Sequence, residues 1–252
     1  RSKFNGTRRT LFRTNTNVEM WNQNRKRIFE EPKIEYVLRS LYSVIKSIKH
    51  LKKNNTDIKV VLKIIDDEST EENLNKIKKL IDKSKIDAEI INHDCSIHKD
   101  VIKKQEKKET FSNLSTLFRA FEIGKKDGED LVYFVEDDYL HFESALEEIV
   151  SSYERISSQL NKDLFICPTD YPFLYMDNEK TNLLIGSRRH WRTISKTLMT
   201  FIAPKSLINL YWNNFVKTCA DLNNPWEKHF YEIYEKEVCL SPVKTLSVHI
   251  TN

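Results

Sequence analysis

Short apolar runs alternate with amphipathic stretches along the first two thirds of this chain. In residues 30–53 the apolar positions recur every three or four residues, and this spacing predicts a helix. In residues 57–70 and 130–140 the apolar residues instead form short β-branched and aromatic runs, which are typical of strands. The same reasoning predicts strands at residues 8–15, 86–94 and 163–171, and helices at residues 70–85, 110–126 and 142–156.

Strands that alternate with helices indicate an α/β fold, with a mainly parallel central sheet flanked by helices. The last third is less regular: residues 191–205 are expected to be extended, and residues 206–217 and 224–236 helical. The chain shows no internal repeat and no linker, so we expect one domain over residues 1–252. In parallel sheets, ligands bind beyond the carboxyl ends of the strands, which makes polar residues there the first candidates for a site.

The composition narrows the class of protein. The chain has 252 residues, 39% of them hydrophobic, and a formal net charge of +4, which together indicate a globular domain without the basic footprint of a nucleic-acid binder. Its four glycines are too scattered to form a P-loop or a dinucleotide-binding fingerprint. No apolar run is long enough to be a transmembrane segment. The four separated cysteines favour a cytoplasmic location, in solution or peripherally on a membrane. Because the chain begins at Arg1, we expect that an upstream segment has been removed.

Three adjacent carboxylates follow the apolar run of residues 131–135. Glu136, Asp137 and Asp138 stand where the predicted strand reaches its carboxyl end. Acidic residues there can simply favour the start of the next helix. Adjacent like charges raise one another's pKa unless a cation neutralises them, however, and oxygen ligands suit Mg²⁺ or Mn²⁺ with positions left for substrate phosphates. The triplet therefore predicts a metal–diphosphate site.

A second acidic pair, Asp66 and Asp67, ends the strand predicted within residues 57–70. This pair can belong to a capped loop, because Ser69 or Thr70 is placed to cap the next helix. Two acidic strand ends in one parallel sheet also fit a shared site. In such a site one group binds a metal, and the other accepts hydrogen bonds from a base or a ribose.

The sequences "VLKIIDDESTEENLNKI" and "LVYFVEDDYL", in this order, resemble the nucleotide-sugar-dependent glycosyltransferases of GT-A fold, with a family 2-like layout. The second is similar to the Glu-Asp-Asp form of the Asp-x-Asp motif. The resemblance implies a nucleotide-sugar-binding half over about residues 8–145 and an acceptor-binding half over about residues 146–252. It also implies Mn²⁺ or Mg²⁺ as cofactor, a nucleoside-diphosphate sugar as donor, and a hydroxyl of a glycan or glycoconjugate as acceptor. The expected reaction is an inverting hexosyl or N-acetylhexosaminyl transfer.

The motif positions of this family can be carried over to individual acidic residues. Asp66 and Asp67 match the position that contacts the base of the nucleotide. Glu136 and Asp137 match the part of the acidic motif that faces the ribose or the diphosphate. Asp138, the last acid of the triplet, matches the direct metal ligand.

Other family positions lie outside the two acidic motifs. Arg13, Thr14 and Asn15 end the first predicted strand, where the family contacts the nucleotide. His249 follows a hydrophobic run near the end of the chain, as does the late histidine that completes the metal shell in several such enzymes. Arg192, in a basic and aromatic loop, is expected to bind donor phosphates; an acidic acceptor or a solvated turn are the alternatives.

The C-terminal third is expected to supply the catalytic base. Family members often place this base beside an aromatic residue at the start of a helix, which selects Glu227, next to Trp226, with Asp221 as the second choice. Glu227 can equally be a first-turn acid that stabilises its helix, and Trp226 a core residue rather than a sugar-stacking one.

These features favour a metal-dependent glycosyltransferase. Two alternatives also cluster carboxylates at strand ends: a divalent-metal phosphoesterase or nuclease, and a phospho-receiver-like signalling domain. His93, Cys95 and His98 superficially resemble a metal cluster, but no second pair stands at zinc-like spacing elsewhere in the chain. We therefore do not expect a zinc site there.

Overall fold

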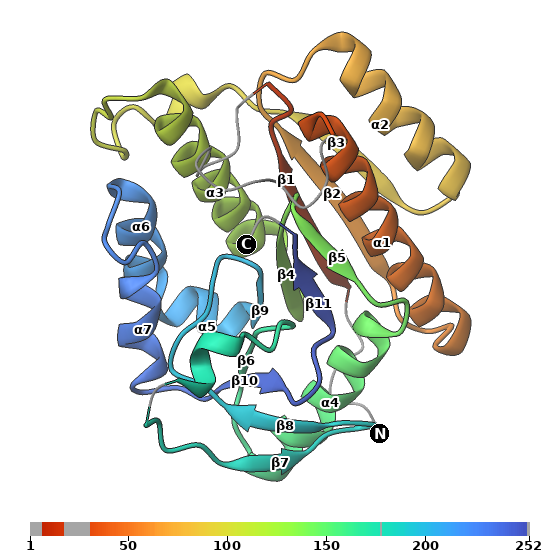
Figure 1. Ribbon diagram of the computed structural model, residues 1–252, viewed down its shortest axis with the longest axis vertical. Coiled ribbons are helices and arrows are strands. Elements are labelled where there is room, and N and C mark those ends of the chain that lie inside the picture. The colour runs from red at the N-terminus through yellow and green to blue at the C-terminus, as the bar shows by residue number, and fades with distance from the viewer. Residues whose placement is uncertain (1–6, 18–30, 177, 251–252) are drawn as a thin grey trace.

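The computed structural model describes residues 7–17, 31–176 and 178–250. In this part of the chain a nine-stranded sheet has the order β3-β2-β1-β4-β9-β6-β10-β8-β7 (Figure 1). Its strands are β1 (Arg8–Thr14), β2 (Val60–Asp66), β3 (Ala88–Asn92), β4 (Leu131–Glu136), β6 (Phe165–Ile166), β7 (Leu183–Ile185), β8 (His190–Thr193), β9 (Phe201–Pro204) and β10 (Cys239–Pro242). Two further strands, β5 (Tyr139–His141) and β11 (Ser247–His249), pair only with each other.

The strand directions confirm the expected sheet. β1 is parallel to β2 and β4, β2 is parallel to β3, and β6 is parallel to β10. β9 is antiparallel to both β4 and β6, and β8 is antiparallel to both β10 and β7. All strands of this sheet except β8 and β9 therefore point the same way, and their carboxyl ends share one edge.

Helices cover both faces of the sheet, because each strand buries alternate side chains on opposite sides. Phe12 and Tyr133 pack toward α1, α2 and α4, whereas Leu11 and Phe134 pack toward α3, α5, α6 and α7. The helices are α1 (Lys33–Asn54), α2 (Glu71–Ser84), α3 (Lys108–Asp127), α4 (Ala145–Leu160), α5 (Lys205–Leu210), α6 (Trp212–Ala220) and α7 (Lys228–Tyr234), with 3-10 turns η1 (Cys95–His98) and η2 (Pro172–Tyr175). Figure 1 shows α1 and α2 on one side of the molecule and α6 and α7 on the other.

Local signals explain where these elements begin. Thr70 caps α2, because its side chain accepts a hydrogen bond from the Asn73 amide at 3.3 Å, and two acids fill the first turn. Pro32 precedes α1, where the missing N–H costs no helical hydrogen bond. The spacing seen in residues 30–53 becomes the buried stripe of α1, which includes Val37, Leu41 and Ile48.

The structure corrects several expected boundaries. The strand expected over residues 163–171 is only β6, because Pro168 has no N–H to continue the ladder. Residues 191–205 form two separate strands, β8 and β9, on different neighbours. The helix expected over residues 206–217 is divided at Tyr211 into α5 and α6. The strand expected over residues 130–140 ends at Glu136, and β5 then enters the small sheet.

Candidate active site

The carboxyl ends of β1, β2 and β4 bring the predicted polar residues together. In the register of the sheet, Thr14 lies opposite Asp66, and Arg13 lies opposite Glu136. The backbone continues this alignment, since the Asp67 amide donates to the Thr14 carbonyl at 3.1 Å. Residues far apart in the sequence are therefore neighbours at one edge of the sheet, as the strand pattern predicted.

Arg13 and Glu136 form an ion pair inside this edge. Arg13 Nη2 lies 2.9 Å from Glu136 Oε1, and Arg13 Nη1 donates to Asn113 Oδ1 at 2.9 Å. Loss of hydration raises the pKa of Glu136 to about 7, although Arg13 lowers it, and the charge of Asp138 adds to the rise. Burial is the largest cause of this rise in pKa, and the charges of Asp138 and Glu227 add to it, so several carboxylates lie near one another at this edge.

Asp137 turns toward the start of α1. Its Oδ2 lies 3.5 Å from Lys33 Nζ, and both side chains are largely covered. Burial raises the pKa of Asp137, while the Lys33 ammonium opposes this effect. Lys33 was not among the residues selected from the sequence, since no strand end or motif marked it. Its signal was only that it opens the first helix.

Asp138 meets His249 across the small sheet. His249 Nε2 lies 3.0 Å from Asp138 Oδ2, and the His249 ring stacks on Tyr139 with centroids 4.6 Å apart. Burial disfavours the charged imidazole, but the hydrogen bond and charge of Asp138 outweigh it and raise the pKa of His249. The two residues predicted to ligate one metal are thus in direct contact.

Asp66 and Asp67, the second acidic pair, lie in different environments. Asp67 Oδ2 accepts hydrogen bonds from Asn15 Nδ2 at 3.2 Å and from Ser112 Oγ. Asp66 is fully buried, and its Oδ2 accepts from the Ser69 amide at 3.3 Å, so the capped-loop interpretation holds for this residue. Burial raises the pKa of Asp66. Ser112, on α3, was missed because nothing in its helical pattern distinguished it.

The two candidate bases lie in different surroundings. Glu227 stands just before α7 with 8% of its surface exposed, and burial raises its pKa. Its charge also raises the pKa of Glu136, so it faces the acidic edge. Asp221, at the end of α6, is half-exposed and accepts hydrogen bonds from Lys103 Nζ at 2.9 Å and Gln105 Nε2 at 3.3 Å, which lower its pKa. Of the two candidate bases, Glu227 is the buried one, and its charge acts on Glu136.

Arg192 has a different set of contacts from the other predicted donor ligands. It lies in β8, which β9, β6 and β10 separate from β4 in the sheet. Its Nη2 is 3.1 Å from Asp170 Oδ1, and its guanidinium lies 3.9 Å from the centre of the Tyr175 ring. Arg192 is therefore an ordered, buried residue and not part of a solvated turn.

Two histidines near η1 are structural. His93 Nε2 and His98 Nδ1 lie 2.9 Å and 2.8 Å from the same Ser115 hydroxyl, and His98 Nε2 lies 3.0 Å from Glu122.

Within residues 7–17, 31–176 and 178–250, no group of three or more His, Cys, Asp or Glu side chains is arranged to hold a metal ion by itself. Asp138 and His249 therefore offer two ligands and not a closed site.

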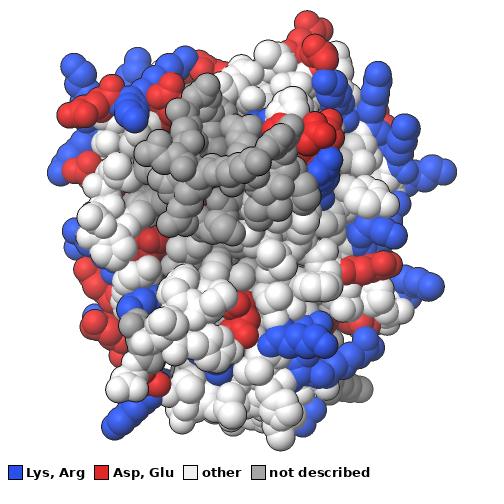
Figure 2. Space-filling view, in the orientation of Figure 1, with Lys and Arg blue, Asp and Glu red and all other residues white. Residues whose placement is uncertain are grey.

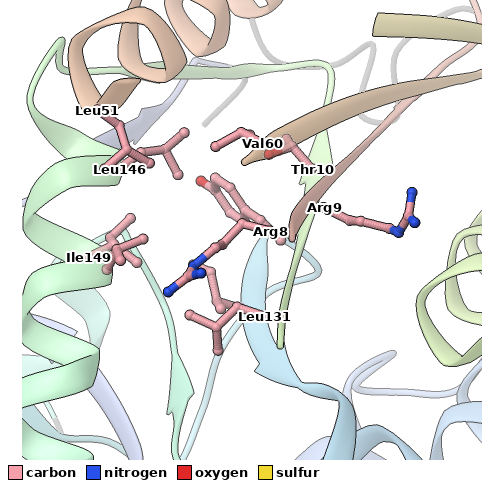
Figure 3. A pocket seen from close by; sticks show the side chains of 11 residues that line it. Arg8, Arg9, Thr10, Leu51, Val60, Leu131, Leu146 and Ile149 are labelled. Carbon is pink, nitrogen blue, oxygen red and sulfur yellow. The ribbon is translucent and has the colours of Figure 1, made fainter. Parts of the chain in front are cut away.

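An apolar pocket lies at the opposite end of β1 (Figure 3). Leu51 of α1, Leu146 and Ile149 of α4, and Leu131 of β4 line it beside Arg8. Arg8 opens β1, whereas the acidic edge begins at the other end of this strand. The pocket is thus remote from the acidic edge and takes no part in its chemistry.

Solved structures of other proteins share this fold. No protein-family model and no curated protein matches the sequence. Among solved structures, S. aureus TarS 1–349 is similar with a TM-score of 0.54 and 13% identity; the match covers 96% of this chain but only 60% of that one. A longer structure of S. aureus TarS gives a TM-score of 0.51 and 14% identity, with 36% of its length covered. An apo UDP-glucose pyrophosphorylase structure is similar with a TM-score of 0.50 and 9% identity, and the match covers 98% of this chain and 94% of that one.

These likenesses confirm the GT-A-like α/β fold that the motifs implied. At such low identity they extend to the fold alone. No helix among the described residues is long and apolar enough to cross a lipid bilayer.

Proposed function

We propose that this chain transfers a sugar from a nucleoside-diphosphate sugar to a hydroxyl of a glycan or glycoconjugate, with inversion at the anomeric carbon. The observation that carries the proposal is the crowding of Glu136, Asp137, Asp138 and Glu227 around the carboxyl ends of parallel strands. Arg13, Lys33 and His249 each pair with one acid of the triplet, and a divalent cation would neutralise the negative charge that remains when a diphosphate is added. The fold's match to UDP-glucose pyrophosphorylase, an enzyme named for a nucleotide sugar, supports the donor class.

The residues of the edge fit a divalent cation that the donor helps to hold. The Asp138 carboxylate and the His249 imidazole, 3.0 Å apart, are ligand types that suit Mn²⁺, and Mg²⁺ is also accommodated by the carboxylate. Two protein ligands leave coordination positions for diphosphate oxygens. When bound, the cation would stabilise the negative charge of the leaving nucleoside diphosphate.

The other residues position the donor. Asp67, fixed by Asn15 and Ser112, presents a carboxylate that can accept hydrogen bonds from the N–H groups of a base. Arg13 holds Glu136 in place, and Lys33 holds Asp137. These pairs keep the acidic side chains at fixed positions before the donor arrives, which lowers the reorganisation that binding requires.

Glu227 is the base in this proposal. As the acceptor oxygen bonds to the anomeric carbon, its proton moves to the Glu227 carboxylate. The bond between the anomeric carbon and the diphosphate oxygen breaks, and its electron pair leaves with the nucleoside diphosphate. Burial raises the pKa of Glu227, which makes it a stronger base than an exposed carboxylate. Asp221, held by Lys103 at the surface, is the second choice.

Calorimetry with UDP, other nucleoside diphosphates and their sugar conjugates tests the proposal, with and without Mn²⁺. We expect binding that requires the cation and is lost in Asp138→Asn. Product analysis then separates the reaction classes, since glycosyl transfer releases a nucleoside diphosphate whereas a phosphoesterase releases a sugar phosphate or inorganic phosphate. Absence of cation-dependent binding to every member of the panel would refute the proposal.

A nucleotidyltransferase is the second candidate, because the chain covers 94% of the apo UDP-glucose pyrophosphorylase structure. Such an enzyme must hold a nucleoside triphosphate. Gly6, Gly124, Gly128 and Gly186 are too scattered to form the glycine-rich loop that commonly cradles these phosphates. Release of pyrophosphate from UTP and a hexose 1-phosphate would identify this activity directly.

A further inference from the structure

Exposed aromatic rings lie beside the candidate active site, on and around η2. Phe173 and Tyr175 have 42% and 57% of their surfaces exposed. With Asp170 and Arg192 they form a connected group, which we name the aromatic platform. Aromatic side chains of this size are usually covered, so an ordered exposed pair is a candidate binding surface.

Hydrogen bonds, an ion pair and a stacking contact hold the platform in place. The Tyr175 hydroxyl donates to Asp170 Oδ2 at 2.8 Å, and Arg192 Nη2 binds Asp170 Oδ1 at 3.1 Å. The Arg192 guanidinium lies 3.9 Å from the centre of the Tyr175 ring. The Asp170 amide in turn donates to Thr245 Oγ1 at 3.0 Å. One face of each exposed ring is thus fixed by polar or stacked neighbours rather than left to rotate.

The platform is continuous with the acidic edge. The Phe173 ring stacks on Tyr171 with centroids 5.2 Å apart, and the Tyr171 hydroxyl contacts the Tyr139 hydroxyl. Tyr139 stacks on His249, which binds Asp138. The charge of Glu136 also contributes to the raised pKa of Tyr171. A chain of aromatic contacts therefore connects the predicted metal ligands to the exposed rings.

We propose that the aromatic platform binds a pyranose ring of the acceptor, an inference that rests on the proposed glycosyl transfer. A pyranose has a face of C–H groups and a rim of hydroxyls. The Tyr175 and Phe173 rings can cover the first, while the Tyr175 hydroxyl and the Asp170 carboxylate beside it can bind the second.

The charge pattern favours a saccharide over a lipid surface. In the view of Figure 2 the surface over η2 is mostly uncharged, whereas Lys and Arg side chains gather along the edge where α1 and α2 lie. Docking on anionic lipids needs basic residues around the exposed apolar ones. At the platform, Arg192 is instead paired with Asp170, which suits a neutral, hydroxyl-rich ligand.

Saturation-transfer NMR on the full chain tests this proposal. The probes are the methyl pyranosides of glucose, galactose and N-acetylglucosamine, with UDP and the diamagnetic cation Mg²⁺ present. We expect saturation of the ring protons of at least one pyranoside, and at least about tenfold weaker binding in Tyr175→Ala. Tyr175→Phe retains the ring and should restore most of the binding. Tyr42→Ala is the matched control, because Tyr42 is 52% exposed on α1.

Several outcomes would overturn the inference. One is the absence of saturation transfer from the wild-type protein to any of the pyranosides. Another is a Tyr175→Ala variant that binds the pyranoside as tightly as the wild-type protein does. A third is sedimentation with phosphatidylglycerol vesicles that Tyr175→Ala abolishes, since this would identify a lipid surface. If calorimetry of the same sample shows UDP binding, only the platform assignment is lost. If UDP with Mn²⁺ does not bind, the proposed function falls as well.

Discussion

Asp138 Oδ2 and His249 Nε2 lie 3.0 Å apart, although 111 residues separate them in the sequence. The antiparallel pairing of β5 with β11 creates this contact, because Tyr139 and His249 are partners in its register. The Ile250 amide also donates to the Asp138 carbonyl at 2.8 Å. β11 and Ile250 therefore belong to the candidate active site.

Substitution of either residue of this pair should abolish cation-dependent donor binding. Asp138→Asn removes the charge that holds the cation, and His249→Gln removes the imidazole ligand. We expect kcat/KM to fall by roughly 1,000-fold in each, equivalent to about 4 kcal/mol of transition-state stabilisation. Calorimetry with UDP and Mn²⁺ measures the binding loss, and EDTA should reproduce it in the wild-type protein.

A matched control for this pair is His190→Gln, at an exposed position of β8. It should retain full binding. Equal UDP affinity in Asp138→Asn and wild type, at saturating Mn²⁺, would remove the pair from the cation site.

Glu227→Gln should separate chemistry from binding. The amide keeps the shape of the side chain but cannot accept the acceptor proton. General-base catalysis contributes about 10² to 10⁴-fold, so kcat should fall by that factor while the UDP dissociation constant stays within about twofold. Steady-state turnover assays measure kcat, and calorimetry measures the UDP dissociation constant. Asp221→Asn is the comparison: a larger loss of kcat there would reverse the assignment of the base.

The strand ends were the part of the site that could be predicted from sequence. Apolar runs that stop at acidic residues indicate both a strand and the residue at which it ends. Parallel pairing then places Thr14 beside Asp66 and Arg13 beside Glu136. This inference succeeds because strand direction and side-chain alternation are local properties. The overall fold was predictable for the same reason.

The remaining contacts depend on tertiary packing that no local pattern encodes. Lys33 reaches Asp137 only because α1 packs against β5, and Ser112 reaches Asp67 only because α3 packs against β1 and β2. The strand expected through residue 140 was wrong because β5 leaves the main sheet for β11. Similarly, the contacts of Arg192 follow from the fold of η2 over β8.

Arg13→Met should destabilise the protein, because it leaves Glu136 largely covered without its cation. Breaking a buried ion pair on one side costs about 3–5 kcal/mol; with 21% of the Glu136 side chain exposed, we expect a loss of about 3 kcal/mol. Urea denaturation followed by circular dichroism measures the free energy of unfolding. The comparison is Lys76→Met, in the exposed Lys76–Glu72 pair, where water screens both charges and the loss should be much smaller. Equal losses in the two variants would show that Arg13 has no special structural role.

Buried histidines should make the protein sensitive to moderate acid. Burial lowers the pKa of His93 from 6.5 to about 4, and the same cause lowers the pKa of His141 to about 4. His93 Nε2 lies 2.9 Å from the Ser115 hydroxyl, a contact that suits a neutral ring. Protonation of either ring is thus easier in the unfolded chain than in the folded one.

The free energy of unfolding should therefore fall as the pH drops from 6.5 toward 4. In this range the unfolded state binds a proton at His93 and the folded state does not, so stability rises with pH. A difference between 6.5 and about 4 corresponds to about 3 kcal/mol at most, and solvent near the partly covered ring reduces the expected loss to about 1–2 kcal/mol. Urea titrations at pH 7 and pH 5 should show a smaller pH effect in His93→Asn than in wild type, with His141 supplying part of the remainder. His190→Asn, at an exposed position, should keep the wild-type pH effect. An unchanged pH effect in His93→Asn would mean that this ring is protonated equally in both states.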